Sequence, residues 1–307
     1  MDNHPLNRRH NIDTAMSSIW ETYKKMFLPL FSISFISALL VSYLSSGIDI
    51  AGIQSMTDPA QIMEAFKPLM GKYLLISLIG ITFSSFMQYY IIHKPGDDST
   101  GMMEMLIKFA GRFLLPLLAV YIILGVISVL AISLGLLALI IGALFVFFYV
   151  AIFFTLSAPV MMIENRSVGE TISRVFSLGH KKFWLNLGWV TLFMMLLIII
   201  SMILSSIILV PFAGGFLKSI FNQDAAVNML EFSRKPSFLI LSSVASALTA
   251  PIYPIFSVVL YFNAASYENE VIINTEYAPE GEKRVTVEDL YSTNNREKEE
   301  ENDGEKE

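Results

Sequence analysis

The residues of this chain that could do chemistry are a few histidines and carboxylates. His93 and His180 are the candidates, with Glu104 and Glu164 in the segments around them. An imidazole titrates near neutral pH, so such a pair could act as a general base or bind a metal ion. No H-E-x-x-H or related spacing supports either role. We interpret both histidines as solvated side chains and predict no catalytic residue, no metal site and no cofactor.

Other patterns that carry chemistry are also missing from the sequence. Asp97 and Asp98 follow Pro95 and Gly96 and could form a pair of metal ligands, but this order is more typical of a turn. The chain has no cysteine, which excludes a thiol nucleophile, a disulfide and a zinc–thiolate site. It also has no glycine-rich phosphate loop with a following lysine, so we expect no ATP-driven work by this chain alone.

The elements that would position these residues are long apolar helices. The run 113–163 contains 51 residues without a charge. A helix of about 20 apolar residues crosses a bilayer core of about 30 Å. The run therefore predicts two crossings, with Gly135 at the turn between them.

Four further charge-free runs each predict one crossing. With 54% hydrophobic and 16% charged residues, the composition also differs from that of a soluble domain. We predict an all-α polytopic integral membrane protein with six transmembrane helices in three hairpins, at residues 27–46, 73–92, 113–134, 136–160, 184–210 and 238–263. Residues 1–26 then form an N-terminal segment, 27–263 the membrane domain and 264–307 a tail.

The distribution of lysine and arginine predicts the orientation. The N-terminal segment and the loops after the second and fourth crossings contain eleven of these residues, whereas the opposite side contains five. Cytoplasmic loops carry the excess of positive charge. We therefore predict that both termini lie in the cytoplasm.

The segment before each odd-numbered crossing has apolar residues at helical spacing. These are Ile12, Ala15, Met16, Ile19, Trp20 and Tyr23; Met102, Met105, Leu106, Phe109, Ala110 and Phe113; and Val168, Ile172, Val175 and Phe176. The third segment opens with Ser167 and Glu170, the spacing of a capping box. We predict three cytoplasmic amphipathic helices among the lipid headgroups, with basic edges toward anionic phospholipid.

The segment 157–184 resembles the connector of a known group of bacterial membrane proteins. It contains a proline near the end of the fourth crossing, a Glu-Asn turn, an amphipathic helix with one arginine, and an aromatic entry into the fifth crossing. This pattern is similar to that of YciC-type proteins and of the membrane domain attached to some glycerophosphodiester phosphodiesterases. The resemblance covers about residues 10–265. It implies a six-helix fold in the bacterial cytoplasmic membrane and supplies no catalytic residue.

The predicted crossings contain no ionisable side chain, which weighs against proton-coupled transport. Gln88, Asn186 and Asn263 are polar and uncharged, and could line a substrate path or simply bond between helices. The sixth crossing contains Pro251, Tyr253 and Pro254. Each proline removes a backbone hydrogen bond, so we predict a kink that is either a packing feature or part of a substrate path.

Small residues recur at every fourth position on two crossings. They are Ser34, Ala38 and Ser42 on the first, and Ser242, Ser246 and Ala250 on the sixth. This spacing places them on one side of each helix and allows backbones to approach closely. We predict that these two helices pack inside the bundle.

Two segments outside the crossings also carry signals. Asp58 and Pro59 are typical of a helix start, and they predict a short helix on the outer surface that closes the first hairpin. Residues 264–307 contain 14 acidic and five basic side chains. We predict a disordered cytoplasmic tail that solubilises the chain or binds a basic protein partner.

These observations favour a non-enzymatic membrane protein that organises lipid or protein partners. A transporter of an apolar or amphipathic substrate is the alternative, and an enzyme that uses His93 and His180 at headgroup level is the third possibility. Membrane lipids are the predicted partners, and we predict no nucleic-acid partner.

Overall fold

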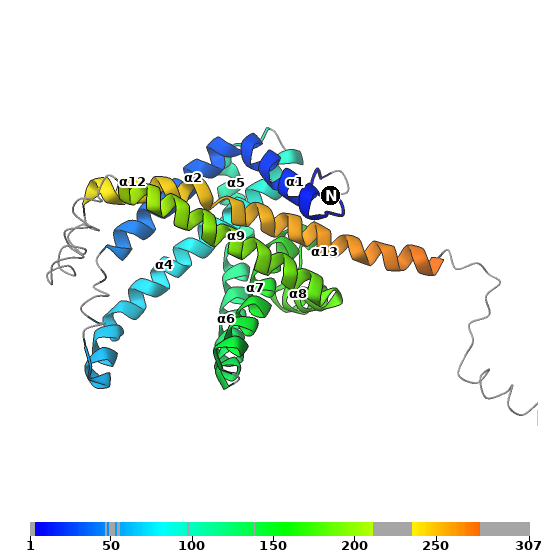
Figure 1. Cartoon of the computed structure of the whole chain (residues 1–307). Coiled ribbons are helices and arrows are strands. Elements are labelled where there is room, and N and C mark those ends of the chain that lie inside the picture. Colours follow the sequence, from blue (N-terminus) through cyan, green and yellow to red (C-terminus); the bar gives the residue numbers. More distant parts are fainter. Residues whose placement is uncertain are drawn as a thin grey trace, which may run out of the picture. The chain divides into compact units, whose positions relative to one another are not determined.

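The computed structural model describes residues 4–46, 48, 53, 56–96, 99–137, 139–210 and 235–276. Its main elements are α1 (Ile12–Lys25), α2 (Phe27–Ser45), α4 (Pro59–His93), α5 (Met102–Phe109), α6 (Leu115–Leu137), α7 (Leu139–Glu164), α8 (Val168–Lys181), α9 (Phe183–Leu209), α12 (Pro236–Thr249) and α13 (Ile252–Glu276) (Figure 1). These ranges contain no strand. The protein is an all-α polytopic membrane protein.

Within the described residues, six helical segments are long and apolar enough to cross a membrane, as predicted. They are Phe27–Ser45, Pro59–Gly96, Met102–Leu137, Ile140–Glu164, Phe183–Ile208 and Pro236–Glu268. Many of their large apolar side chains are exposed, for example Ile122, Leu130 and Leu137 on α6. In a bilayer such side chains face lipid instead of water.

The first hairpin differs from the prediction in the segment between its two crossings. Asp58 caps a helix as expected, since its carboxylate accepts a hydrogen bond of 2.9 Å from the Ala60 amide. The helix that starts there does not stop, however, but continues through Pro68 to His93 as α4. The predicted short surface helix is therefore wrong, because Pro68 does not end the helix.

Gly135 does not form the turn of the second hairpin. It lies inside α6, buried against α7, in the pair of helices that run side by side in Figure 1. A Cβ atom at this position would lie 3.0 Å from the Gly142 carbonyl oxygen and 3.0 Å from Val146 Cγ2. The glycine thus allows α6 and α7 to approach closely.

The predicted kink in the sixth crossing coincides with an interruption of the helix at Ala250 and Pro251. Helix α12 ends at Thr249 and α13 begins at Ile252, on either side of Pro251. Pro251 has no backbone N–H to donate, so it cannot continue the ladder of α12. Its carbonyl accepts the first bond of the new helix, from the Ile255 amide at 3.2 Å.

Helices α2 and α12 pack against each other. Ser34 is buried and its hydroxyl lies 3.1 Å from Met87 Sδ, while the Ser243 hydroxyl donates to Ser42 Oγ at 3.2 Å. Ala38, Ser42 and Ser242 are half-buried. Ser246 and Ala250 are exposed, so their predicted place in the contact is wrong. The buried small residues of α12 are instead Ser243, Ala245 and Ala247.

An amphipathic helix precedes the first, third and fifth spans, as predicted: α1, α5 and α8. The Glu170 carboxylate accepts from the Ser167 amide at 2.9 Å and from its hydroxyl at 2.7 Å, which confirms the contact expected for a capping box. Helix α5 is not separate from the span that follows. It runs into α6 through one π-helical turn, Ala110–Leu114 (η2).

The chain divides into two compact units, Met1–Ser266 and Tyr267–Glu307. The core of the first unit includes the last two turns of α4, the second half of α7 and the first half of α13. Phe193 of α9 and Phe256 of α13 stack there with ring centres 3.7 Å apart. The second unit is described to Glu276, thirteen residues beyond the helix end predicted at Asn263. The predicted disordered tail beyond it lies outside the described residues.

Candidate functional site

The candidate histidines occupy separate aromatic surroundings. The His93 ring stacks on Tyr89 with centroids 4.0 Å apart, and its Nδ1 lies 2.9 Å from the Tyr89 carbonyl oxygen. His180 is exposed on α8, with Nε2 3.0 Å from the Tyr149 hydroxyl. Glu104 forms an ion pair with Lys108 on its own helix at 2.9 Å.

Asp97 and Asp98 lie outside the described residues. Across the part of the chain that the structure describes, no group of three or more His, Cys, Asp and Glu side chains is placed to hold a metal ion.

Glu164 is the centre of an ion-pair cluster at the end of α7. Its side chain is 14% exposed and its two oxygens each lie 3.0 Å from Arg174 Nε of α8. Arg166 Nε lies 2.5 Å from one of these oxygens, and the Tyr261 hydroxyl of α13 donates to the other at 3.1 Å. One carboxylate thus joins three helices.

The turn that follows Glu164 has a backbone suited to this arrangement. Asn165 adopts a left-handed conformation with φ of 53°, which asparagine tolerates better than most residues. Its side-chain oxygen accepts from Arg112 Nη2 at 2.7 Å, which ties the π-helical turn before α6 to the turn after α7. The sequence contained the Glu-Asn pair, but no spacing in it linked Glu164 to Arg174 or to Tyr261.

A buried polar seam, formed by Gln88, Thr155, Tyr253 and Ser257, crosses the core between α4, α7 and α13. The Ser257 hydroxyl lies 3.0 Å from Gln88 Oε1 and 2.5 Å from the Thr155 carbonyl oxygen. The hydroxyls of Thr155 and Tyr253 are 3.1 Å apart. The prolines on either side of Tyr253, Pro251 and Pro254, are both buried.

Two of the predicted path residues lie elsewhere. The Asn186 side chain donates to the carbonyl oxygens of Leu178 at 3.0 Å and Gly179 at 3.2 Å, near the end of α8. It thereby satisfies carbonyls that a helix end leaves unpaired. Asn263 Oδ1 accepts from the His10 amide at 3.0 Å. The six predicted path residues therefore belong to three separate places, and only Gln88 and Tyr253 share the polar seam.

The N-terminal segment is packed against the helices, which the sequence did not indicate. Leu6 and His10 are buried, and the His4 ring stacks on Phe262 with centroids 5.0 Å apart. Burial lowers the pKa of His4 and of His10 below the usual value. Both imidazoles are therefore neutral at pH 7.

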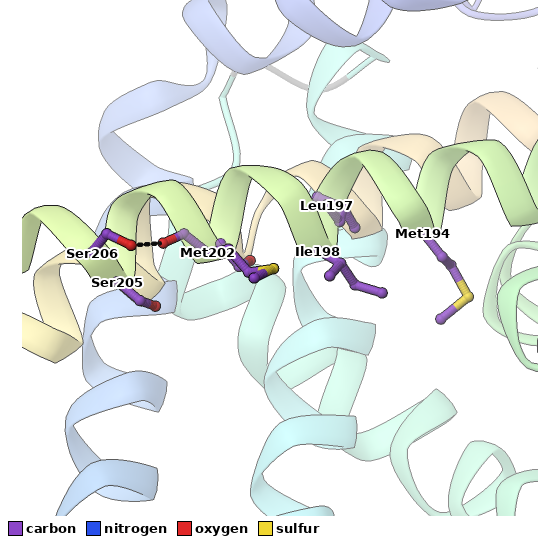
Figure 2. Close-up of a pocket in the computed structure, with 7 residues that line it drawn as sticks. Met194, Leu197, Ile198, Met202, Ser205 and Ser206 are labelled. Atoms are coloured by element: carbon purple, nitrogen blue, oxygen red, sulfur yellow. Dashed lines mark hydrogen bonds between the residues drawn. The ribbon is translucent and has the colours of Figure 1, made fainter.

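A groove of about 520 Å³ runs along one side of α9. The groove is lined by apolar side chains, such as Met194 and Ile198, and by the serines Ser201, Ser205 and Ser206. Figure 2 draws the lining residues as sticks, and the Ser206 hydroxyl donates to the Met202 carbonyl oxygen at 2.8 Å. That bond leaves the serine compatible with an apolar surrounding.

Comparison with known proteins gives no relative: no protein-family model, no curated protein and no solved structure matches this chain.

Proposed function

We propose that this protein is a non-enzymatic component of the bacterial cytoplasmic membrane that organises anionic phospholipid. The observation that carries the proposal is the placement of α1, α5 and α8, each directly before an apolar span. Each has basic side chains near its end, Lys24 and Lys25, Lys108, and His180 with Lys181. Exposed apolar side chains accompany α1 and α5, including Trp20 and Ile107, whereas the apolar side of α8 packs against the core and exposed Trp184 follows it at the start of α9.

This combination is what an interfacial helix needs. Apolar side chains enter the boundary between headgroups and acyl chains, and lysines remain at the level of the phosphates. Each lysine or arginine near an anionic surface contributes about 1 kcal/mol. The basic ends of α1, α5 and α8 together would concentrate anionic lipid around the membrane domain.

The orientation that we propose places both termini and all three amphipathic helices in the cytoplasm. The excess of lysine and arginine in the segments around these helices supports it. The acidic tail would then project from the same surface, where a basic protein is the partner that its charge favours. The resemblance to YciC-type proteins agrees with this location.

Lipid analysis of the protein in native nanodiscs tests the proposal. We expect anionic phospholipid to be enriched around the wild-type chain relative to the bulk membrane. Lys108→Gln/Lys181→Gln/Lys182→Gln should reduce that enrichment by at least twofold, whereas Lys67→Gln/Lys72→Gln on the opposite side should not. Bulk lipid proportions around the wild-type protein would refute the proposal.

The tail is tested separately, because its partner would be a protein. A chain that ends at Glu276 should keep its lipids and lose any stoichiometric basic protein that copurifies with the full chain. Retention of that protein by the shortened chain would exclude the tail as its binding site.

A second candidate function, transport of an apolar or amphipathic substrate, is favoured by one observation. The helix break at Pro251 adjoins the polar seam, and broken helices with polar groups at the break form substrate sites in many transporters. Pro251→Ala/Pro254→Ala should then abolish transport while the protein stays folded. The seam residues already bond to one another, which is why we rank this function second.

A further inference from the structure

A cavity of about 240 Å³ lies between the N-terminal segment, α1 and the end of α4. We call it the N-terminal cavity. Six polar or charged residues line it: His4, Arg8, Ser18, Glu21, Thr22 and Lys25.

The apolar lining of the N-terminal cavity is formed by Leu6, Met26 and Ile91, together with Pro5 and Pro95. Leu6, Met26 and Ile91 are almost completely buried, so this wall is part of the packed core. The cavity therefore combines a fixed apolar wall with charged side chains in the same small space.

The charges of this cavity favour an anion. Arg8 and Lys25 are positive at neutral pH, and Glu21 is the carboxylate among the lining residues. Arg8 Nη2 donates to the Ser18 hydroxyl at 2.8 Å, which holds the guanidinium at the wall although the residue is exposed. A guanidinium held in this way can bind phosphate with two parallel hydrogen bonds.

Size and position narrow the class of ligand. Pockets for drug-sized molecules measure about 300–1,000 Å³, so a cavity of about 240 Å³ suits a smaller group. The cavity lies where α1 meets α2 and where α4 ends, which is the end of two apolar spans. At such a level in the bilayer, the small phosphate-bearing groups are lipid headgroups.

We propose that the N-terminal cavity binds the phosphate of one anionic phospholipid between Arg8 and Lys25, with the adjoining glycerol against Leu6 and Met26. This inference deepens the proposed function and rests on it, because it adds a stoichiometric site to a diffuse preference for anionic lipid. A soluble phosphate ester offers the same chemistry without the acyl chains, and the test separates the two sources.

The first measurement is native mass spectrometry of the purified chain, titrated with phosphatidylglycerol. The wild-type protein should retain one lipid. Arg8→Gln/Lys25→Gln should weaken this binding at least tenfold. The matched control is Arg9→Gln/Lys94→Gln, which removes the same charge at the sequence neighbours of Arg8 and Pro95, because neither Arg9 nor Lys94 lines the cavity.

The control variant should bind within about twofold of the wild type. Equal weakening in both variants would overturn the proposal, because it would show diffuse attraction to charge. Unchanged binding in Arg8→Gln/Lys25→Gln would also overturn it. Thr22→Phe keeps every charge and places a ring in the cavity, so this variant should also lose the bound lipid. An unchanged midpoint of thermal unfolding shows that the variant is folded.

The source of the phosphate is tested by thermal stability in phosphatidylcholine nanodiscs. Glycerol phosphate and inorganic phosphate should stabilise the protein less than phosphatidylglycerol does. Equal stabilisation by the soluble ester would overturn the lipid assignment.

This inference and the proposed function can fail separately. The cavity alone is refuted if Arg8→Gln/Lys25→Gln keeps both the enrichment of anionic lipid in native nanodiscs and the single bound lipid. A single bound lipid without enrichment supports the cavity and refutes the proposed function.

Discussion

Glu164 connects α7, α8 and α13 through one carboxylate, with Arg174 only 20% exposed beside it. Removing one partner of a poorly exposed ion pair leaves the other charge without compensation. We expect Glu164→Gln to destabilise the protein by about 1–3 kcal/mol. Thermal unfolding in detergent measures this as a lower midpoint.

The matched control for Glu164 is Glu104→Gln. Glu104 also pairs with a cation, Lys108, but the two side chains are 59% and 52% exposed. Exposed pairs contribute about 0–1 kcal/mol, so this change should have little effect. Equal losses in both variants would show that burial does not set the strength of the Glu164 cluster.

The buried histidines predict that the N-terminal segment detaches in acid. Burial lowers the pKa of His10, and the charge of Arg8 lowers it further. Burial also lowers the pKa of His4, and a charge on His93 opposes its protonation. The detached segment takes up protons below about pH 6.5, whereas the docked segment resists them, so docking weakens as pH falls from about 6.5 toward the lowered pKa values. The protection of the His10 amide, which bonds to Asn263, against hydrogen exchange should therefore decrease in that range, once the exchange rate is corrected for the intrinsic pH dependence of an unprotected amide.

The variant His10→Gln provides the comparison for this pH effect. Glutamine cannot take up the proton, so the acid-dependent part of the exchange should decrease while the part due to His4 remains. A protection factor of the His10 amide that does not change between pH 7.5 and pH 5.5 in the wild type would contradict the prediction.

Single side-chain partners were the least accessible to prediction from the sequence. Gln88 and Asn263 were identified as polar groups within apolar runs, but their partners Ser257 and His10 are 169 and 253 residues away. No periodicity reports a contact over such a separation. The docking of His4 and His10 was missed because a short polar segment carries too little apolar pattern to indicate burial.

At the scale of elements, Gly179 controls the contact between α8 and α7. A Cβ atom there would lie 2.8 Å from Phe153 Cε1 and 3.2 Å from Cδ1. The ring has little room to move, because it stacks on Phe176 at 4.3 Å and meets Tyr149 edge-on at 4.8 Å. Gly179→Ala should therefore destabilise the protein by about 1–3 kcal/mol, measured as a lower thermal midpoint.

Gly169→Ala is the control on the same helix. Nothing lies within 4 Å of a Cβ atom at Gly169, so alanine should be neutral or stabilise α8 by up to about 1 kcal/mol. If both alanine variants behave alike, the close contact with Phe153 does not limit the packing of α8.

Most elements were predictable because their signals are local. Long charge-free runs give the six spans, and apolar spacing gives α1, α5 and α8. The misassignments occurred where two local signals competed. The helix predicted to start at Asp58 and Pro59 is not short but continues to His93, and Gly135, predicted to form a turn, is a packing position. Contacts with neighbouring helices determine whether a helix continues or ends at such residues, and local sequence patterns do not report these contacts.

At the scale of the whole molecule, the absence of cysteine allows a direct test of orientation. Helix α4 has 35 residues and is about 52 Å long, so its two ends must reach opposite sides of a core of about 30 Å. We expect Glu64→Cys to react with an impermeant maleimide in intact cells, and Ser99→Cys only in inverted vesicles. Reaction of both from one side would contradict six crossings.

The spans also differ in length, and this has a consequence for the choice of membrane. Helix α2 has 19 residues and is about 28 Å long, little more than half the length of α4. A long helix adapts to a thinner bilayer by tilting, but a short one cannot stretch in a thicker bilayer. Each additional ångström of hydrocarbon would then add a fraction of a kcal/mol of hydrophobic mismatch at α2. Bilayer thickness should therefore sort this protein toward thinner membrane regions, with α2 as the limiting element.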